Sequence, residues 1–470
     1  MNKKCQVFTP QDYVEKLLNS VDYLHDLYGK KILENSCGDG NILTVVVQRY
    51  IDDCRRKGLS RTKIRNGLSR DIYGVEIDPE QYKKCLINLN AIIEQNDILP
   101  VDWKLYNDDY LKMKLFEEYK FDYIVGNPPY ITYSELKKTD QVYLKKTFES
   151  CKKGKFDYCY AFIEKSLQEL SSTGKMAYLI PSSIFKTVFG ENLRRILLPN
   201  LVAINDYTQE KVFSDALVKS AIIVLSKADV NGEIHYIDET TQVDMRLQRT
   251  ALGKKWAFAY ENTGEHRFGD YFKVSHAIAT LCNKAYVIKE WEIDASGNYV
   301  CNGVTLEKDM IRNATSPKLF HNGKKEKIIF PYQYDENHSL IRLDEKIFRK
   351  KYPGTCSYLM KFRKDLDNRD SDNSSQWFEY GRSQALSDLD CEKALLSTII
   401  SSEVLVYKID KETIPYAGMY IIPKTGQYSI DEGIDILMQE TFFRYAQNIG
   451  IHINGNSVRI TSKDIEEYRF

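Results

Sequence analysis

The short apolar run FDYIVG (121–126) leads directly into Asn127, Pro128, Pro129 and Tyr130. Two consecutive prolines fix φ and remove two backbone donors, so the segment presents stiff carbonyl acceptors. The side-chain oxygen of Asn127 and the carbonyl of Pro128 can each accept one hydrogen of a planar amino group, which turns its lone pair toward an electrophile. Tyr130 adds a ring that stacks on a flat substrate. An isolated Asn-Pro-Pro would indicate only a tight turn, but after an apolar strand it predicts a loop that makes an amino or amide nitrogen nucleophilic.

Glycines and acids follow three earlier apolar runs. They are the turn CGDG (37–40), Glu76 and the pair Asp109-Tyr110. Ligands of an open parallel sheet bind at the carboxyl ends of its strands, and glycines there let a ligand approach the backbone closely. A carboxylate at the end of the second strand suits ribose hydroxyls, and a carboxylate beside a ring suits an adenine. The glycine turn is not a complete G-x-G-x-x-G, and no G-x-x-x-x-G-K-[ST] loop occurs. S-adenosylmethionine therefore fits better than NAD or ATP.

These residues need a scaffold of alternating strands and helices, and the first half of the chain predicts one. Strand-like runs lie at 30–34, 71–77, 102–107, 121–126, 175–181 and 218–227, and helical patterns lie at 12–27, 42–57, 78–93, 161–170 and 191–199. This alternation predicts an α/β, Rossmann-like domain with a parallel sheet covered on both faces. The basic segment 55–70 is interpreted as a solvated loop at the opposite end of the sheet.

The alternation stops near residue 235. Short β-like runs follow at 286–293, 327–334, 404–409 and 418–424, with helical patterns near 384–398 and 430–447. We therefore predict a catalytic domain over residues 1–235 and a mixed α+β domain over residues 236–470.

Composition limits the classes of protein that remain. Lys plus Arg and Asp plus Glu each number 66 in 470 residues, so a uniformly basic surface for nucleic acid is excluded and any contact must come from local patches. The ten cysteines have no C-x-x-C spacing and the seven histidines no H-E-x-x-H spacing, so no metal site is expected. No signal peptide and no run of 18 apolar residues occurs, so we expect a cytoplasmic protein without a membrane segment.

The ordered motifs are FTP (8–10), ENSCGDG (34–40), VEIDP (75–79), DYL (109–111), DYIVGNPPY (122–130) and DYCYAFIE (157–164). In sequence and in order they resemble the N6-adenine DNA methyltransferases of the TaqI-like gamma class, over most of residues 5–230. The resemblance implies an S-adenosylmethionine-dependent methyltransferase domain followed by a DNA target-recognition domain. One departure is Asn35-Ser36, where the family usually has Pro-Ala.

The resemblance also implies roles for particular residues. Residues 127–130 become the catalytic loop. Thr9 and Glu34 are expected near the methionine part of the cofactor, Glu76 on the ribose, and Asp109 on the cofactor adenine. The remaining cofactor-binding residues are Cys37, Gly38, Gly40, Ile77, Tyr110 and Phe162, the last two as walls of the adenine site.

An adenine inside duplex DNA is reached only after it is flipped out of the stack. The family has a second aromatic facing the flipped base, which here falls in the segment IPSSIFKTVFGENL (180–193). We choose Phe189 as the partner of Tyr130 in the base pocket. Phe185 remains the alternative, because spacing does not separate the two and either ring can belong to the core.

Two segments are candidates for DNA contact. The first follows the catalytic loop, and the second resembles W-[FY]-E-Y-G-R-x-Q segments of target-recognition domains, as does PYAGMYIIP (415–423). The candidate residues are Lys137, Lys138, Lys145, Lys146, Trp377, Tyr380, Arg382 and Gln384. Lysines suit phosphates, and Arg and Gln suit guanine and adenine edges. The alternative for Trp377 and Tyr380 is a place in the core, with Arg382 in a salt bridge.

The leading hypothesis is a site-specific DNA (adenine-N6) methyltransferase of a restriction-modification or related system. We expect a monomer that acts on double-stranded DNA, with a cognate restriction endonuclease as a further partner. Protein glutamine or RNA base N-methylation remains an alternative, because those nitrogens also have a delocalised lone pair and need the same activation as nucleophiles. A fused nuclease is not expected, since the methyltransferase motifs begin near residue 8 and no Pro-Asp dipeptide occurs. A DNA-binding module without activity would not need an intact Asn-Pro-Pro-Tyr loop.

Overall fold

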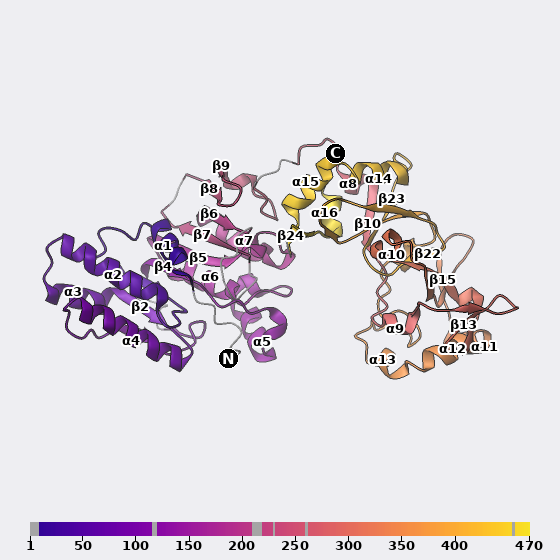
Figure 1. The fold of residues 1–470 in the computed structure, drawn as a ribbon, viewed down its shortest axis with the longest axis horizontal. Helices are drawn as coiled ribbons and strands as arrows, with labels where there is room; N and C mark the ends of the chain where they lie inside the picture. Colours follow the sequence, from indigo (N-terminus) through magenta and orange to yellow (C-terminus); the bar gives the residue numbers. More distant parts are fainter. Residues whose placement is uncertain (1–8, 115–119, 209–218, 229–230, 259–261, 454–455) are drawn as a thin grey trace. The chain divides into compact units, whose positions relative to one another are not determined.

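The computed structural model describes residues 9–114, 120–208, 219–228, 231–258, 262–453 and 456–470. The chain divides into two compact units, Met1–Phe258 and Ala259–Phe470 (Figure 1). The division lies later than the predicted boundary at 235/236. The reason is the hairpin of β8 (Glu233–Asp238) and β9 (Val243–Gln248), because β8 pairs in parallel with β6 and so extends the sheet of unit 1.

Unit 1 is built on a nine-stranded sheet with the order β3-β2-β1-β4-β5-β7-β6-β8-β9. Its first seven strands are β1 Ile32–Glu34, β2 Ile72–Val75, β3 Lys104–Tyr106, β4 Phe121–Gly126, β5 Leu170–Pro181, β6 Leu201–Tyr207 and β7 Ser220–Ser226. The strands from β3 to β5 are mutually parallel, which confirms the Rossmann-like prediction. β7 runs antiparallel to both β5 and β6, so the far half of the sheet is not parallel as expected.

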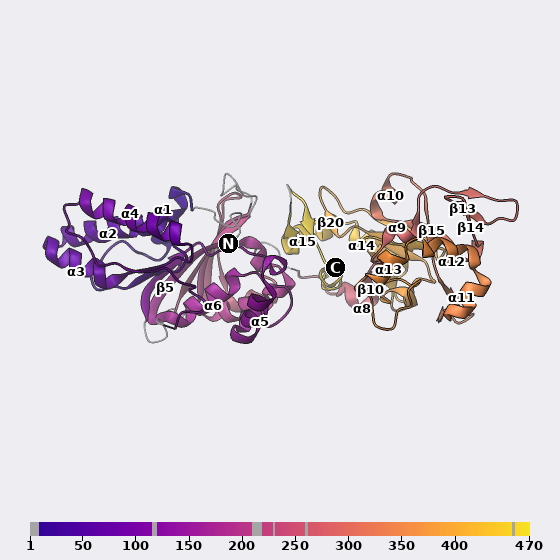
Figure 2. The same ribbon diagram turned by 90° about the horizontal axis from the view of Figure 1, so that it is seen from below.

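Helices cover both faces of this sheet, as Figure 2 shows. They are α1 Gln11–Ser20, α2 Asn41–Arg56, α3 Arg61–Asp71, α4 Pro79–Gln95, α5 Lys138–Thr147, α6 Cys159–Glu169 and α7 Glu191–Leu197. The apolar sides of α1, α2 and α4 pack into one core on one face. Those of α6 and α7 pack into a second core on the other face. The first part of unit 1 is thus a three-layer α/β structure.

The interpretation of segment 55–70 as a solvated loop is wrong, because most of it forms α3. Ser60 begins this helix by accepting a hydrogen bond from the amide of Lys63. At its end, buried Asp71 accepts a hydrogen bond from the hydroxyl of Tyr50 at 2.6 Å and pairs with Arg70. The helix was not recognised in this charged segment because it has few apolar residues, although two of them, Ile64 and Leu68, are buried.

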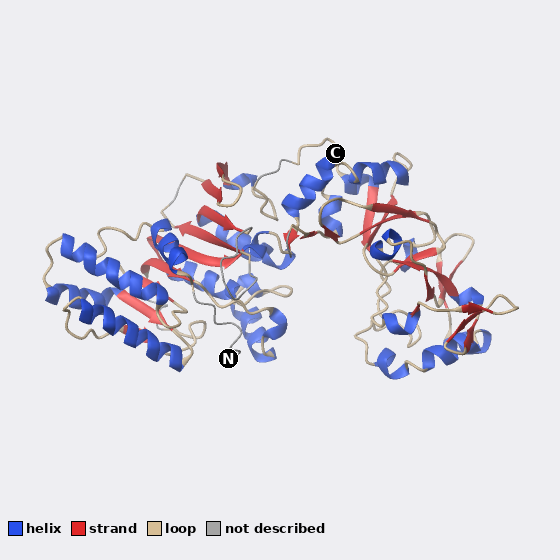
Figure 3. Cartoon of the chain, in the orientation of Figure 1, coloured by secondary structure: helices blue, strands red, loops and turns tan. Residues whose placement is uncertain are grey.

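Unit 2 combines several small sheets with short helices, as Figure 3 shows. Its strands are β10 Phe272–His276, β11 Val287–Ile288, β12 Glu292–Ile293, β13 Tyr299–Cys301, β14 Val304–Leu306, β15 Ile311–Thr315, β16 Glu326–Ile329, β17 Tyr332–Tyr334, β18 Leu340–Arg342, β19 Lys393–Leu396, β20 Ile399–Ile400, β21 Val406–Ile409, β22 Thr413–Pro415, β23 Met419–Pro423, β24 Ile451–His452 and β25 Val458–Arg459. Its helices are α8 Phe268–Tyr271, α9 Asn283–Tyr286, α10 Pro317–His321, α11 Glu345–Lys351, α12 Pro353–Met360, α13 Arg363–Asp367, α14 Ile430–Leu437, α15 Glu440–Ile449 and α16 Ser462–Glu466.

The mixed α+β prediction is confirmed for this unit, with one exception. Residues near 430–447 form α14 and α15, and Ser429 and Glu432 make the capping box that begins α14. The helical pattern near 384–398 is wrong, because β19 lies there between β21 and β23 in a four-stranded sheet. β19 is buried throughout, so it has no polar face to distinguish a strand from a buried helix.

Within the residues that the structure describes, no helix combines the length and apolar character needed to cross a bilayer. The same residues contain no cluster of three or more His, Cys, Asp or Glu side chains arranged to hold a metal ion.

Candidate active site

The loop of residues 127–130 follows β4, next to the point where the strand order of the sheet reverses. β1 pairs with β2 on one side and with β4 on the other, all in parallel. Connections from such neighbours leave the sheet in opposite directions, which opens a ligand-binding crevice at their carboxyl ends. The position of this loop relative to the glycine turn after β1 is therefore the one that the sequence motifs predict.

Neighbouring strands anchor the catalytic loop at both ends. The Ser36 hydroxyl, just after β1, donates to the backbone carbonyl of Asn127 at 3.3 Å. The Tyr130 hydroxyl donates to the carbonyl of Leu179 in β5 at 2.8 Å. Burial raises the pKa of Tyr130 well above its ordinary value, so this hydroxyl remains a donor. The ring of Tyr130 is left half-buried between the two cores of unit 1.

The glycine turn is tied to the acid at the end of β2. The amide of Gly38 donates to one carboxylate oxygen of Glu76 at 2.9 Å, and the amide of Asp78 donates to the other at 2.8 Å. Gly38 and Gly40 both have positive φ, and a Cβ on Gly40 would lie 2.8 Å from the sulfur of Cys85. Only glycine fits Gly40 without a shift of that side chain. Each Glu76 oxygen keeps acceptor capacity for a ribose hydroxyl.

Thr9 and Glu34 lie buried at the same edge of the sheet. The backbone carbonyl of Thr9 accepts a hydrogen bond from the side-chain amide of Asn41, which begins α2, at 3.1 Å. The Oε2 atom of Glu34 is buried and has no hydrogen-bond partner among the described residues. Burial raises the pKa of this carboxyl well above its ordinary value. A buried acceptor without a partner suits the polar, cationic methionine portion of S-adenosylmethionine, so the residues fit this cofactor.

The predicted adenine site contains a continuous aromatic wall. The rings of Tyr110 and Phe162 lie 5.4 Å apart, tilted by 36°, and both are buried. Since they touch each other, they can line the same side of a cofactor and not opposite sides. Asp109 binds Lys112 at 2.8 Å, and Ile77 is 43% exposed. The contacts of these four candidate residues with a cofactor remain a prediction.

The structure separates the two phenylalanines that spacing could not. Phe185 is 2% exposed and stacks on Trp256, with ring centroids 5.9 Å apart. Phe189 is 43% exposed. It lines a pocket of about 210 Å³ together with Thr132, Tyr133, Ser134, Lys155, Phe156, Asp157, Tyr160, Pro181, Ser183, Ile184 and Thr187. Phe185 therefore belongs to the core, and Phe189 lies in a pocket that begins two residues after the catalytic loop.

Two further residues, Arg194 and Asp157, help to shape this pocket, and the sequence analysis assigned neither of them to it. Arg194 is buried in α7, and its guanidinium donates to the carbonyls of Ile184 and Thr187 at 2.6 and 2.9 Å. It thereby fixes the loop that carries Phe189. Residues 131–132 pair with residues 157–158, since the Tyr158 amide donates to the carbonyl of Ile131 at 2.9 Å. Asp157 appeared in the sequence only as part of a motif, and nothing in the sequence distinguished Arg194 from a surface arginine.

The basic segment after the loop forms α5 and the turn before it. Lys137, Lys138 and Lys146 are exposed, and Lys145 lies 4.8 Å above the ring of Tyr133. Their contact with DNA remains a prediction.

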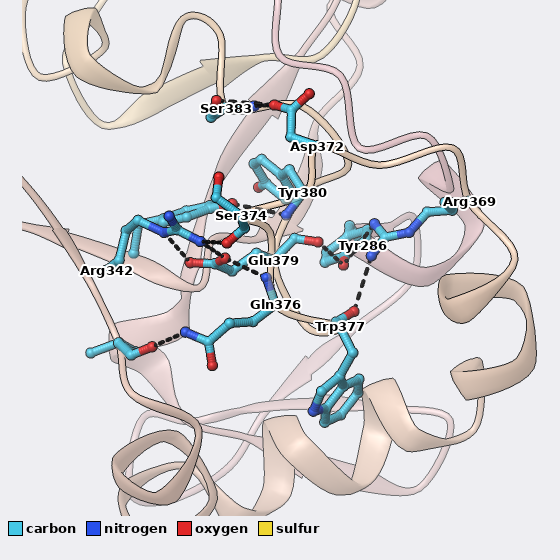
Figure 4. A network of polar contacts seen from close by, with 12 residues as sticks. Tyr286, Arg342, Arg369, Asp372, Ser374, Gln376, Trp377, Glu379, Tyr380 and Ser383 are labelled. Carbon is cyan, nitrogen blue, oxygen red and sulfur yellow. Dashed lines mark hydrogen bonds and ion pairs between the residues drawn. The ribbon is translucent and has the colours of Figure 1, made fainter.

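The aromatic segment of unit 2 faces inward (Figure 4). Tyr380 is fully buried, and its hydroxyl donates to the carbonyl of Ile329 at 2.7 Å, so the predicted DNA contact of Tyr380 is wrong. The Trp377 indole donates to Glu345 at 2.8 Å and packs under Arg363. The ring of Tyr380 instead lies in the core of unit 2, and the ring of Trp377 is partly buried and packs against that core, as the alternative interpretation allowed.

The polar members of the same segment form internal pairs. Glu379 is buried and binds the guanidinium of Arg342 (Figure 4). Arg382 is engaged by Asp370 at 3.0 Å and Asp372 at 3.2 Å. Gln384 is exposed. Arg382 and Gln384 therefore remain candidates for DNA contact. To contact DNA, Arg382 has to give up its ion pairs with Asp370 and Asp372.

The strand order of unit 1 is that of a Rossmann-like domain, with the Asn-Pro-Pro-Tyr loop at the carboxyl end of β4. Residues 70–213 match the family model described as Eco57I restriction-modification methylase. This match confirms the methyltransferase resemblance at the level of restriction-modification methylases for that part of the chain.

Curated relatives agree with this assignment. The chain is 23% identical to the Type II restriction enzyme and methyltransferase RM.Eco57I of Escherichia coli, over 90% of this chain and 52% of the relative. It is 21% identical to the Type II methyltransferase M.BstVI of Geobacillus stearothermophilus, over 98% of this chain and 89% of the relative. The chain thus spans about half the length of RM.Eco57I.

Solved structures extend the similarity to both units at the level of the fold. The Type IIL restriction-modification enzyme MmeI, solved in complex with DNA, superposes with a TM-score of 0.59 at 15% identity, over 98% of this chain and 63% of its own. The structure of a DrdV–DNA complex gives a TM-score of 0.54 at 12% identity, over 94% of this chain and 51% of its own.

Proposed function

We propose that the chain is a site-specific DNA (adenine-N6) methyltransferase. The observation that carries the proposal is the anchored loop of residues 127–130 at the carboxyl end of β4, with the lining of the Phe189 pocket beginning two residues further along the chain. The name of RM.Eco57I and the DNA in the MmeI structure support a DNA substrate. Unit 2 would supply target recognition, and a cognate restriction endonuclease would be a functional partner of a monomeric enzyme.

In this proposal the chain provides alignment. The Asn127 side-chain oxygen and the Pro128 carbonyl bind the two hydrogens of the exocyclic amino group, so its lone pair points at the methyl donor. The donor supplies a methyl group on a positively charged sulfur. As the nitrogen–carbon bond forms and the sulfur–carbon bond breaks, the surplus amino proton passes to water. Stiff prolines and the Ser36 and Tyr130 anchors keep both acceptors in place, and no strong base is needed.

The substrate base would lie between Tyr130 and Phe189. Tyr130 is a half-buried ring in the catalytic loop, and Phe189 is a partly exposed ring in a pocket whose lining begins at Thr132, two residues further along the chain. Stacking of a base on an aromatic side chain stabilises the complex by about 1–3 kcal/mol, which offsets much of the loss of stacking in the duplex.

The proposal is tested by incubating the full chain with S-adenosylmethionine and, separately, duplex DNA, structured RNA and a mixture of proteins. Substrates are then digested and analysed by mass spectrometry. We expect N6-methyldeoxyadenosine from the DNA alone. N4-methyldeoxycytidine, a methylated ribonucleoside or methylglutamine as the main product would contradict the proposal.

The matched control is Asn127→Ala. It should abolish transfer while calorimetry still detects cofactor binding, because Asn127 is assigned to the substrate amino group. Retained transfer would remove Asn127 from the mechanism.

A further inference from the structure

Asn35 directly follows β1, and its side chain is hydrogen-bonded to α6. It is 2% exposed, and its Nδ2 atom donates to the hydroxyl of Ser166 in α6 at 2.7 Å. The single proton of that hydroxyl is donated to the carbonyl of Phe162, also at 2.7 Å. The Ser166 hydroxyl also lies 2.7 Å from the hydroxyl of Tyr178 and 3.1 Å from that of Tyr110. In this network the amide nitrogen of Asn35 faces Ser166, and its amide oxygen points away from that hydroxyl.

Asn35 lies beside the carboxyl ends of the paired strands β1 and β4. Asn35 Oδ1 is buried and has no hydrogen-bond partner among the described residues. It lies 3.8 Å from the place a Cβ on Gly126 would take, and Gly126 directly precedes Asn127 of the catalytic loop. A buried acceptor without a partner is strongly disfavoured in a finished structure, so such an atom indicates a group that a ligand supplies.

The neighbouring residue points to the charge of that group. Glu34 also has a buried oxygen, Oε2, and in the described part of the chain nothing donates a hydrogen bond to it. Two consecutive residues at the end of β1, Glu34 and Asn35, thus each have a buried side-chain oxygen without a hydrogen-bond partner among the described residues. A site with surplus acceptors and low water content favours a positively charged ligand group.

We propose that Asn35 Oδ1 faces the positively charged methylsulfonium of the methyl donor and makes the site prefer S-adenosylmethionine over S-adenosylhomocysteine. The two ligands share the adenosine, the ammonium and the carboxylate, and they differ in the methyl group and charge at sulfur. An acceptor dipole beside the sulfonium therefore stabilises the donor and not the neutral product. Asn35 acts as a specificity-determining residue that limits product inhibition. This inference rests on the proposed function only for the identity of the methyl donor.

The test is isothermal titration calorimetry of the full chain with each ligand, without DNA. The variants are Asn35→Leu, which removes the oxygen at similar volume, and Asn35→Asp, which keeps an acceptor oxygen. Since a hydrogen bond or dipole contact to a charged group is worth more than one to a neutral group, we expect Asn35→Leu to weaken S-adenosylmethionine roughly tenfold more than S-adenosylhomocysteine. Asn35→Asp should keep or increase the preference for the cation.

Asn107→Leu is the matched control. Asn107 also follows a strand of this sheet, but its side-chain amide supports the backbone carbonyl of Glu76 at 2.8 Å. We expect it to change both affinities by the same factor. If Asn35→Leu does not fold by circular dichroism, Ser166→Ala releases the anchor of Asn35 and should reduce the preference in part.

The outcomes distinguish the two proposals. If Asn35→Leu loses affinity equally for both ligands, or loses none, the role of Asn35 is overturned and the methyltransferase proposal is not affected. Binding of neither ligand by the wild type overturns the donor and with it both proposals.

Discussion

The ring of Phe189 lies directly against Gly154, so closely that a Cβ on Gly154 would be 1.9 Å from the Cδ1 atom of Phe189. Gly154 has φ of +71° and belongs to the basic turn after α5. The loop with Phe189 and the turn with Lys155 are therefore in direct contact, and both line the same pocket.

Gly154→Ala should displace Phe189 and lower kcat/KM for DNA, with little change in the affinity for S-adenosylmethionine. Gly58→Ala is a matched control, because Gly58 has φ of +69° and a Cβ there would have no other atom within 4 Å. Both variants carry the left-handed backbone strain of about 1–2 kcal/mol, but only one carries the clash. Equal activities of the two variants would show that the position of Phe189 does not matter.

Phe185→Ala should mainly lower stability, whereas Phe189→Ala should mainly affect binding of the target base. Phe185 is buried against Trp256, so its removal should lower the free energy of unfolding by about 3–5 kcal/mol. Phe189 is 43% exposed, so its removal should cost less stability than that of Phe185, on the order of 1 kcal/mol. Phe189→Ala should instead weaken the fluorescence increase of 2-aminopurine placed at the target adenine. An unchanged signal would remove Phe189 from the base pocket.

Asp157→Asn should alter the dependence of stability on pH. Burial raises the pKa of the Asp157 carboxyl to about 6 from 3.8. The folded protein then holds this proton more tightly than the unfolded chain, so the stabilisation is full below pH 3.8 and is lost as the pH rises through about 6. The asparagine keeps an acceptor for the amide of Cys159 and does not ionise.

We expect the stability of the variant, relative to the wild type, to increase between these two pH values, by about 3 kcal/mol at neutral pH. Thermal unfolding across this range measures the difference. Asp372→Asn is the control of opposite sign, because hydrogen bonds from Ser383 lower the pKa of Asp372. A difference between Asp157→Asn and the wild type that does not vary with pH would contradict the assignment.

Lys138→Ala and Lys146→Ala should each weaken DNA binding and reduce the slope of log K against log salt by about 1, if each lysine contacts one phosphate. Both lysines are exposed on α5, close in sequence to the catalytic loop. Lys63→Ala is the control, because Lys63 lies in α3, before β2, at the amino end of that strand. Identical slopes for all three variants would place the DNA elsewhere.

The positions of the candidate site residues of unit 1 could be predicted from the sequence because these residues follow the ends of strands. Glycines, acids and the Asn-Pro-Pro-Tyr loop follow short apolar runs, and a parallel sheet brings those ends together whatever the details of packing. The antiparallel direction of β7 was missed, because the direction of a strand leaves no trace in its own apolar pattern. The helix α3 was missed because its core contacts rest on a few residues, such as Ile64 and Leu68, within a charged run.

The second unit shows where a local pattern cannot decide. Trp377, Tyr380 and Arg382 have the composition of a nucleic-acid contact and also that of a core with internal ion pairs. Which of the two holds depends on distant partners, such as Ile329 for Tyr380 and Glu345 for Trp377. The choice between Phe185 and Phe189 likewise depended on Trp256, a residue about 70 positions away that no motif marks.

The most direct test of the central claim is single-molecule sequencing of unmethylated genomic DNA after incubation with S-adenosylmethionine and either the wild type or Asn127→Ala. We expect N6-methyladenine in one fully modified sequence motif with the wild type and none with the variant. Modification by both proteins, or modified cytosine in place of adenine, would contradict the proposed function.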